Sequence, residues 1–169
     1  MKLILFLSCL TLAFNVGCGY RLSGSGKNLP PEARTIAIPD FKNNTLRFQV
    51  EQFVTQAVRE ELIRRSHLAL VENIAQADLV LEGQVQSFEV TPISYSDRAA
   101  ANLYEVRISV NVRVIDQKKN ELVFEGNNVN FRHSYQTDQA DFFSQETEAL
   151  SQIAVKFAST IVASILENF

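Results

Sequence analysis

The chain has 169 residues, of which 46% are hydrophobic and 21% charged. This is the composition of a globular protein and the length of one domain. The formal net charge of -3 excludes the global basic field that attracts nucleic acid or anionic lipid. Any contact with a phosphorylated ligand must therefore depend on a few local cations.

The N-terminus has the pattern of an export signal. A lysine precedes an apolar run over residues 3–14, which falls within the roughly 7 to 15 residues of a secretory core and below the roughly 20 needed to span a bilayer. Gly17-Cys18 resembles the end of a bacterial lipobox, although Asn15 stands where that pattern prefers an aliphatic residue. We therefore predict a lipoprotein signal peptide over residues 1–17 and lipid attachment at Cys18.

Two alternatives to this prediction remain open. Cys9 is a competing cleavage point, but it lies inside the apolar run, and an ordinary secretory signal would leave Cys18 as a free thiol. After cleavage before Cys18 the mature chain keeps one cysteine, so it forms neither an internal disulfide nor a thiolate metal cluster. That thiol is available for a diacylglycerol and acyl chains such as palmitate, and two or more chains give stable anchoring. We expect a peripheral protein, with no segment after residue 14 apolar enough to cross a membrane.

The remaining chain divides into a linker and one body. Ser23-Gly24-Ser25-Gly26 is flexible and Pro30-Pro31 is stiff, so residues 18–34 are predicted to be the lipidated N-terminus and linker. A single domain is expected over residues 35–169.

The first half of the body alternates short strands with one helix. Apolar runs predict a strand at 35–39, allow a short one at 68–71, and predict a longer one at 77–90 that ends at Thr91-Pro92. From Val50 the apolar residues recur at helical spacing up to the basic pair Arg64-Arg65, which favours an amphipathic helix.

The second half has the clearest periodicities. Residues 104–114 alternate between apolar and polar, so one face of this strand should be buried and the other wet. The returning strand changes phase between Phe124 and Val129, which predicts a β-bulge at residues 126–128, with Leu122 and Phe124 on the apolar face before it. A final helical stripe runs from Leu150 to Phe169 and is expected to pack on the core. Together these elements predict an α+β fold, in which two helices cover one face of a small, mostly antiparallel sheet.

Residues that could carry catalysis are sparse. His67 and His133 are far apart and have neither metal-ligand nor triad spacing, and a Gly-rich phosphate loop is missing from the sequence. Asp138 and Asp141 precede the last helix, where aspartates usually act as caps or turn residues. We therefore expect no enzymatic activity, no metal and no cofactor.

The order of several short motifs resembles the LptE family, the lipopolysaccharide-assembly lipoproteins of Gram-negative outer membranes. The resemblance spans nearly the whole mature chain and is carried by Cys18-Gly19-Tyr20-Arg21-Leu22, Phe41 with Asn43-Asn44-Thr45, Ala77-Asp78-Leu79-Val80-Leu81-Glu82-Gly83-Gln84-Val85, Pro92 with Ser94, and Tyr104-Glu105-Val106. The resemblance implies a two-helix, four-stranded α+β body seated in the lumen of the β-barrel LptD, as a plug and assembly factor that also binds lipopolysaccharide. Gly19 after the cysteine fits sorting to the outer membrane.

The same resemblance points to a cation for lipid A phosphates. Relatives carry a basic residue just before the corresponding tyrosine strand, and Arg98 in the turn at 96–100 is the matching candidate. Arginine can grip a phosphate with two hydrogen bonds. Lys118 and Lys119 in the next hairpin are a second choice, for which a solvated turn is the simpler explanation.

Two other functions compete with this reading. Residues 36–41 also resemble the first strand of periplasmic lipoproteins of the CsgG and LpoB type, which secrete subunits or activate peptidoglycan synthases. A soluble periplasmic hydrolase is the third class, and it would require an acid or nucleophile whose mutation abolishes turnover.

Overall fold

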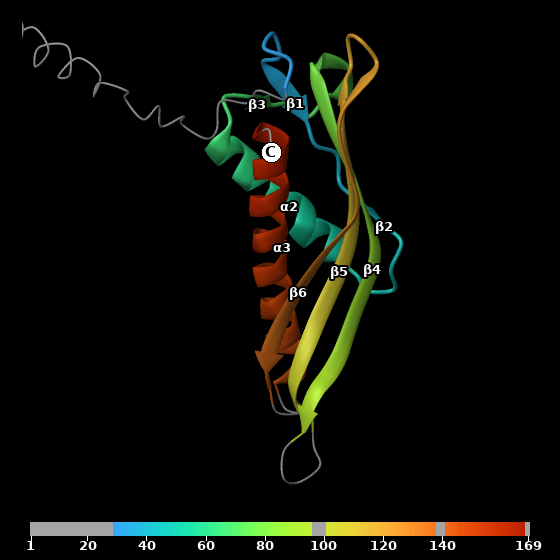
Figure 1. Ribbon diagram of the computed structural model, residues 1–169, viewed down its shortest axis with the longest axis vertical. Helices are drawn as coiled ribbons and strands as arrows, with labels where there is room; N and C mark the ends of the chain where they lie inside the picture. Colours follow the sequence, from blue (N-terminus) through green and yellow to red (C-terminus); the bar gives the residue numbers. More distant parts are fainter. Residues whose placement is uncertain (1–28, 96–100, 138–140, 168–169) are drawn as a thin grey trace, which may run out of the picture.

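The computed structural model describes residues 29–95, 101–137 and 141–167. In these residues, two α-helices lie together on one side of a long twisted sheet, which confirms the predicted α+β class (Figure 1). The chain enters near β1 at one end of the body. The last helix ends near the same end, and the end of β4 and the start of β5 lie at the far end of the body.

The sheet is mixed and has six strands, in the order β3-β1-β4-β5-β6 with β2 beside β4. The short strands β1 (Thr35–Ala37), β2 (Lys42–Asn43) and β3 (Ala69–Leu70) all pair in parallel. The four-stranded, mostly antiparallel sheet predicted from the sequence is therefore wrong in strand number and in its N-terminal half. The strands expected at 35–39 and 68–71 are present as β1 and β3, whereas β2 has two residues, too few for an alternation to be recognised.

The antiparallel half of the sheet is a long arm of three strands. It consists of β4 (Leu79–Tyr95), β5 (Ala101–Asp116) and β6 (Glu121–Gln136). At about 3.4 Å per residue, a strand of this length extends for roughly 50 Å. The predicted alternation in β5 is confirmed, since one face contributes a row of fully buried side chains: Val106, Ile108, Val110, Val112 and Val114.

The predicted bulge in β6 is confirmed, and a second one accompanies it. Val110 pairs with Val129 and Val112 with Gly126, so the two intervening residues of β6 face one residue of β5. A further register shift follows Val114 and turns Leu122 toward solvent, where it is 55% exposed. The expectation that Leu122 shares the apolar face is therefore wrong.

Strand β4 continues past Pro92, which contradicts the predicted end at Thr91-Pro92. Pro92 pairs with Tyr104, and the strand runs on to Tyr95 with register shifts on the way. After Val85, the described chain places a neighbour beside β4 only on the β5 side. A proline whose nitrogen faces the free side of an edge strand removes no ladder hydrogen bond.

The two helices supply the other half of the core. Helix α2 (Val50–Arg65) buries Val54, Val58 and Leu62, and helix α3 (Phe142–Leu166) buries the stripe predicted from the sequence as far as Leu166. By length and composition alone, α3 is apolar enough to cross a membrane, so the expectation of no such segment was wrong. Its apolar side chains are buried against the sheet and α2, which is the placement of a core helix.

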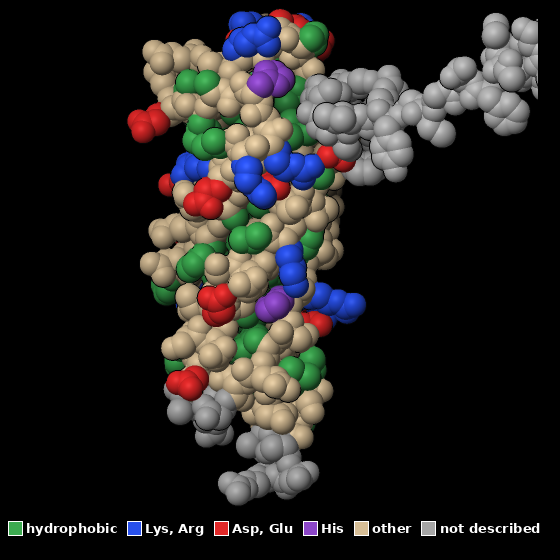
Figure 2. All heavy atoms as spheres, turned by 90° about the vertical axis from the view of Figure 1, so that its left-hand side faces the viewer, with side chains coloured by type: hydrophobic (Ala, Val, Ile, Leu, Met, Phe, Trp, Pro, Cys, Tyr) green, Lys and Arg blue, Asp and Glu red, His purple; other side chains and the backbone are tan. Residues whose placement is uncertain are grey.

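The core also includes residues upstream of 35. Leu29 and Ala33, in the stretch predicted as linker, are buried, and the backbone N–H of Arg34 donates to the Asp78 carboxylate at 2.8 Å. Asp78 follows the short 3₁₀ helix η2 (Ile74–Gln76). On the helix side of the molecule, basic and acidic side chains are interspersed and hydrophobic ones appear in small separate groups (Figure 2).

Candidate functional site

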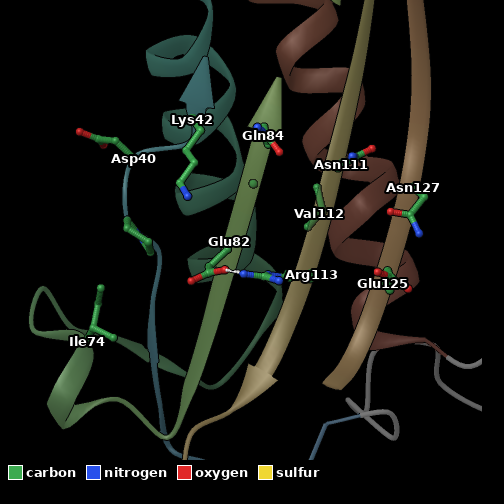
Figure 3. Close-up of a pocket in the computed structure, with 12 residues that line it drawn as sticks. Asp40, Lys42, Ile74, Glu82, Gln84, Asn111, Val112, Arg113, Glu125 and Asn127 are labelled. Carbon is green, nitrogen blue, oxygen red and sulfur yellow. Dashed lines mark hydrogen bonds and ion pairs between the residues drawn. The ribbon is translucent and has the colours of Figure 1, made fainter. Parts of the chain in front are cut away.

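On the face of the sheet that points away from the helices, polar side chains line a pocket beyond a small apolar cluster of Ala37, Ala77 and Val80. Its wall is built by neighbouring strands and by the segment that joins β1 to β2 (Figure 3). The pocket has a volume of about 440 Å³, and its polar lining residues include Lys42, Glu82, Gln84, Asn111, Arg113, Glu125 and Asn127. Successive side chains of a strand point to opposite faces of the sheet. Because the neighbours of Glu82, Gln84, Asn111 and Arg113 in β4 and β5 point into the core, these four side chains point outward.

The β6 bulge shapes one side of this pocket. Asn128 has a φ of 50°, in the left-handed region that asparagine tolerates better than most residues. Its backbone N–H donates to the side-chain oxygen of Asn111 at 2.7 Å. This hydrogen bond holds the bulged part of β6, which contributes Asn127 to the pocket, against β5. A regular antiparallel pair of strands would not form it.

The charges in the pocket are mixed. Arg113 donates to Glu82 through Nε at 2.7 Å and lies 2.5 Å away through Nη2. Lys42 is directed into the pocket and has no ion pair among the described residues, whereas Asp40 points away and binds Arg59 at 3.0 Å. Because cations and carboxylates alternate along its walls, the pocket suits a polar ligand of mixed or no charge better than a polyanion.

The polar face of β5 is present as the sequence predicted. Arg107 binds Glu105 at 2.6 Å and approaches Glu89 at 3.9 Å, and Ser109 is largely covered. The arginines on this face are thus paired with carboxylates of β5 itself and of β4. The result is a hydrophilic surface without a strong field of one sign.

Lys118 and Lys119 each form an ion pair with a carboxylate. Lys118 Nζ lies 2.6 Å from Asp78 Oδ1, and Lys119 Nζ lies 2.7 Å from Glu32 Oε1. These carboxylates raise the pKa of both lysines, and the hydrogen bond from Lys118 is the largest cause that lowers the pKa of Asp78. The two lysines therefore connect the β5–β6 turn to Asp78, just before β4, and to Glu32, just before β1. Sequence spacing could not reveal these ion pairs, because the partners are distant along the chain.

Arg98 and Cys18, the two other predicted site residues, lie outside the described residues. Lys118 and Lys119 follow the end of β5 at Asp116.

An aromatic cluster near the β4–β5 end was not anticipated from the sequence. Tyr135 stacks on Tyr104 with ring centroids 5.7 Å apart, and Phe142 meets Tyr104 edge to face at 5.0 Å. The hydroxyl of Tyr135 is buried without a hydrogen-bond partner in the described chain, and burial raises its pKa to about 12. Beside the cluster, Arg47 Nε lies 2.7 Å from the buried carboxylate of Glu146.

The architecture defines the class of protein as a small α+β domain with two helices on one face of a mixed sheet. Similar solved structures include a putative lipoprotein from Caulobacter crescentus, with 16% identity, 75% of this chain and 88% of that chain covered, and a TM-score of 0.55. An uncharacterized lipoprotein B from Nitrosomonas europaea has 14% identity, 88% and 90% coverage, and a TM-score of 0.51. The PelC dodecamer from Paraburkholderia phytofirmans has 14% identity, 80% and 90% coverage, and a TM-score of 0.52. At these identities the similarity shows the fold alone.

The sequence identifies the family more closely. A comparison with curated proteins gives no significant match. The model of the family described as LptE, lipopolysaccharide-assembly, matches residues 33–165, and the chain therefore belongs to the LptE family. This confirms the resemblance noted from the motifs and makes the protein an LptE-like lipoprotein of a non-enzymatic assembly family.

Proposed function

We propose that the protein is an outer-membrane lipoprotein, anchored through acyl and diacylglycerol lipid on Cys18, that plugs and helps to assemble an LptD-type β-barrel. In this role it binds lipopolysaccharide and takes part in its transport and insertion into the outer leaflet. The observation that carries the proposal is the family match, which extends over residues 33–165 and so covers the body from the first strand to the last helix.

The shape and polarity of the body support a plug. A barrel wide enough to pass a lipid has a water-filled lumen that must be closed by a plug, and the surface of the plug must present polar groups to water. The long arm of β4, β5 and β6 buries one face under the helices and leaves the other hydrophilic, with charges balanced within the sheet. Such a body can stand in a wet lumen without exposing its core.

Arg98 remains our first candidate for a lipid A phosphate contact. The proposal for Lys118 and Lys119 is weaker, because each would first have to leave its partner, Asp78 or Glu32. We expect Arg98→Ala to lose lipopolysaccharide binding and the residual binding to be less sensitive to salt. Arg64→Ala, which removes an arginine that is 72% exposed and not a candidate contact, is the matched control, and binding by Arg98→Ala as tight as by this control would remove Arg98 from the site.

Isolation of the full-length protein from outer membranes tests the proposal as a whole. We expect a large, heat-modifiable barrel protein to co-purify with it, and Cys18→Ala to release the body from membranes. A barrel that is recovered in normal amounts from cells lacking the lipoprotein would contradict the assembly role.

A ring-forming or synthase-activating lipoprotein of the CsgG and LpoB type is the second candidate. It is favoured by one observation, the similarity in fold to a chain that assembles as a dodecamer. Recovery of a penicillin-binding protein, or of a homo-oligomer large enough to be a pore, would support this candidate over the barrel plug.

A further inference from the structure

The loop between β2 and α2 presents two apolar side chains to solvent. Leu46 is 98% exposed and Phe48 is 82% exposed, and with Phe143 at 77% they are the three most exposed large hydrophobic side chains of the described residues. Leu46 and Phe48 flank Arg47 in the chain, Phe143 lies one turn before Glu146 in α3, and the ion pair of Arg47 with Glu146 joins the loop to the first turns of α3. Exposed apolar side chains that gather at one place mark an interaction site more often than scattered ones do.

This loop is held in one conformation by its own polar groups. The Asn43 side chain donates to the Arg47 carbonyl at 2.9 Å and to Glu51 at 2.7 Å, and it accepts from the backbone N–H of Thr45 at 2.8 Å. Gln49 closes the loop with a φ of 68°, in the left-handed region that a non-glycine residue adopts only when its surroundings require it. The network thus orders a loop whose outward side chains contribute nothing to the core, which is the arrangement of a preorganised contact.

An unpaired strand edge begins where this loop leaves the sheet. The last backbone hydrogen bond between them runs from Asn44 N to the carbonyl of Val85, at 3.0 Å, and the Asn44 side chain reaches Gln86 at 3.4 Å. Beyond it, β4 continues for ten residues, 86–95, with β5 as its one strand neighbour within the described chain. Backbone donors and acceptors along such an edge are satisfied specifically by another extended chain.

We propose that the loop with Leu46 and Phe48, together with the free edge of β4, docks an extended segment of a protein partner. The segment adds to β4 as a further strand and covers the two apolar side chains. This inference rests on the proposed function, in which that partner is the LptD-type barrel protein.

The charges of this surface argue against a membrane as the occupant. A membrane-binding surface carries cations free to meet anionic headgroups, whereas Arg47, the cation between the two apolar side chains, is held by Glu146. A lipid also offers no regular backbone to pair with β4. A second copy would bring its own free β4 edge, and the crosslinking experiment below separates that occupant from the barrel.

Co-expression of the tagged full-length protein with the LptD-type barrel of the same bacterium provides the test. Leu46→Ser with Phe48→Ser is expected to lower barrel recovery by about tenfold or more, with unchanged thermal unfolding. Ile63→Ser with Val155→Ser is the matched control, because these apolar side chains of α2 and α3 are also exposed, at 54% and 56%, and its recovery should equal that of the wild type. Equal recovery by the loop variant would overturn the docking surface and leave the proposed function intact, whereas no recovery by the wild type would overturn both.

A photo-crosslinking residue identifies the occupant directly. Placed at Phe48, and separately at Ile93, which is 49% exposed on the free part of β4, it is expected to form adducts with the barrel at both positions. Adducts with a second copy or with lipid, or the lack of a barrel adduct at either position, would overturn the proposal.

Discussion

The ring of Phe41 lies against Gly83 and occupies the space where any other residue would place its Cβ. Gly83 pairs with Val112 in the middle of the sheet, and Phe41 itself is buried in the main core. The contact holds the β1–β2 segment on β4, at the start of the wall that forms the polar pocket. It also explains a glycine inside a strand, which otherwise weakens the strand.

Gly83→Ala should therefore destabilise the protein. A Cβ there would overlap the Phe41 ring, and overpacking of this kind costs about 1 to 3 kcal/mol of the free energy of unfolding. Chemical denaturation measures the change. Combining Gly83→Ala with Phe41→Leu should cost less than the sum of the two single variants, because the smaller side chain can move aside, and simple additivity would contradict the contact.

Thr55 links the same segment to helix α2. Its hydroxyl accepts from the backbone N–H of Phe41 at 3.0 Å and donates to the carbonyl of Glu51 at 2.6 Å, at a site that is 1% exposed. Thr55→Val keeps the shape but leaves that N–H unsatisfied, which should cost about 1 to 3 kcal/mol in the same measurement. Thr55→Ser retains the hydroxyl and should cost less; the opposite order would show that packing, and not the hydrogen bond, matters there.

Asp78 should make the fold sensitive to acid. Hydrogen bonds from Lys118 and from the backbone of Arg34 and Thr35 lower its pKa in the folded state. A carboxylate with a lowered pKa stabilises the native state above its unfolded pKa of about 3.9, and this contribution is lost as the pH falls through the folded pKa.

We expect Asp78→Asn to lower the melting temperature at pH 7 and to weaken its dependence on pH below about 4. Thermal unfolding followed by circular dichroism across this range measures both effects. Asp40→Asn serves as the control, because the Asp40 side chain is 75% exposed beside Arg59 and should have little influence.

His133 and Lys156 should form a second pH-dependent contact. His133 Nδ1 lies 3.1 Å from Lys156 Nζ, and burial followed by the charge of Lys156 lowers the pKa of the histidine. A histidine whose folded pKa is lowered loses its stabilising contribution as the pH falls below the unfolded value of about 6.5. Lys156→Gln should raise the His133 pKa, as measured by NMR titration, and an unchanged value would show that burial alone sets it.

The elements that could be predicted from the sequence are those in which a hydrophobic period repeats over many residues. The alternation in β5, the phase change in β6 and the long stripe of α3 each involve many residues, and all three were found by pattern alone. Strands β2 and β3 have two residues each and are held by parallel pairing to distant parts of the chain, so local sequence carries no sign of their partners. Pro92 was misleading because the effect of a proline on a strand depends on the neighbouring strands. A proline removes a ladder hydrogen bond only where a second strand pairs with β4 on the side that its nitrogen faces.

The candidate site was predicted in part. The polar face of β5 followed from the alternation, whereas the pocket depends on how the β1–β2 segment crosses the sheet. Lys118 and Lys119 looked like free cations, and only the fold brings Asp78 and Glu32 to them. The exposed Leu46 and Phe48 look like ordinary apolar residues before a helix, because burial is a property of the whole structure.

The sequence by itself determined the family, the two-helix α+β class and the amphipathic strands, because each depends on ordered motifs or on periods repeated along the chain. The tertiary structure alone decided the parallel strands, the partners of the charged side chains, the free edge of β4 and the loop beside it. These features arise from contacts between segments that are dozens of residues apart in the sequence. The ion-pair partners and the solvent exposure of a side chain are therefore set only once the chain has folded.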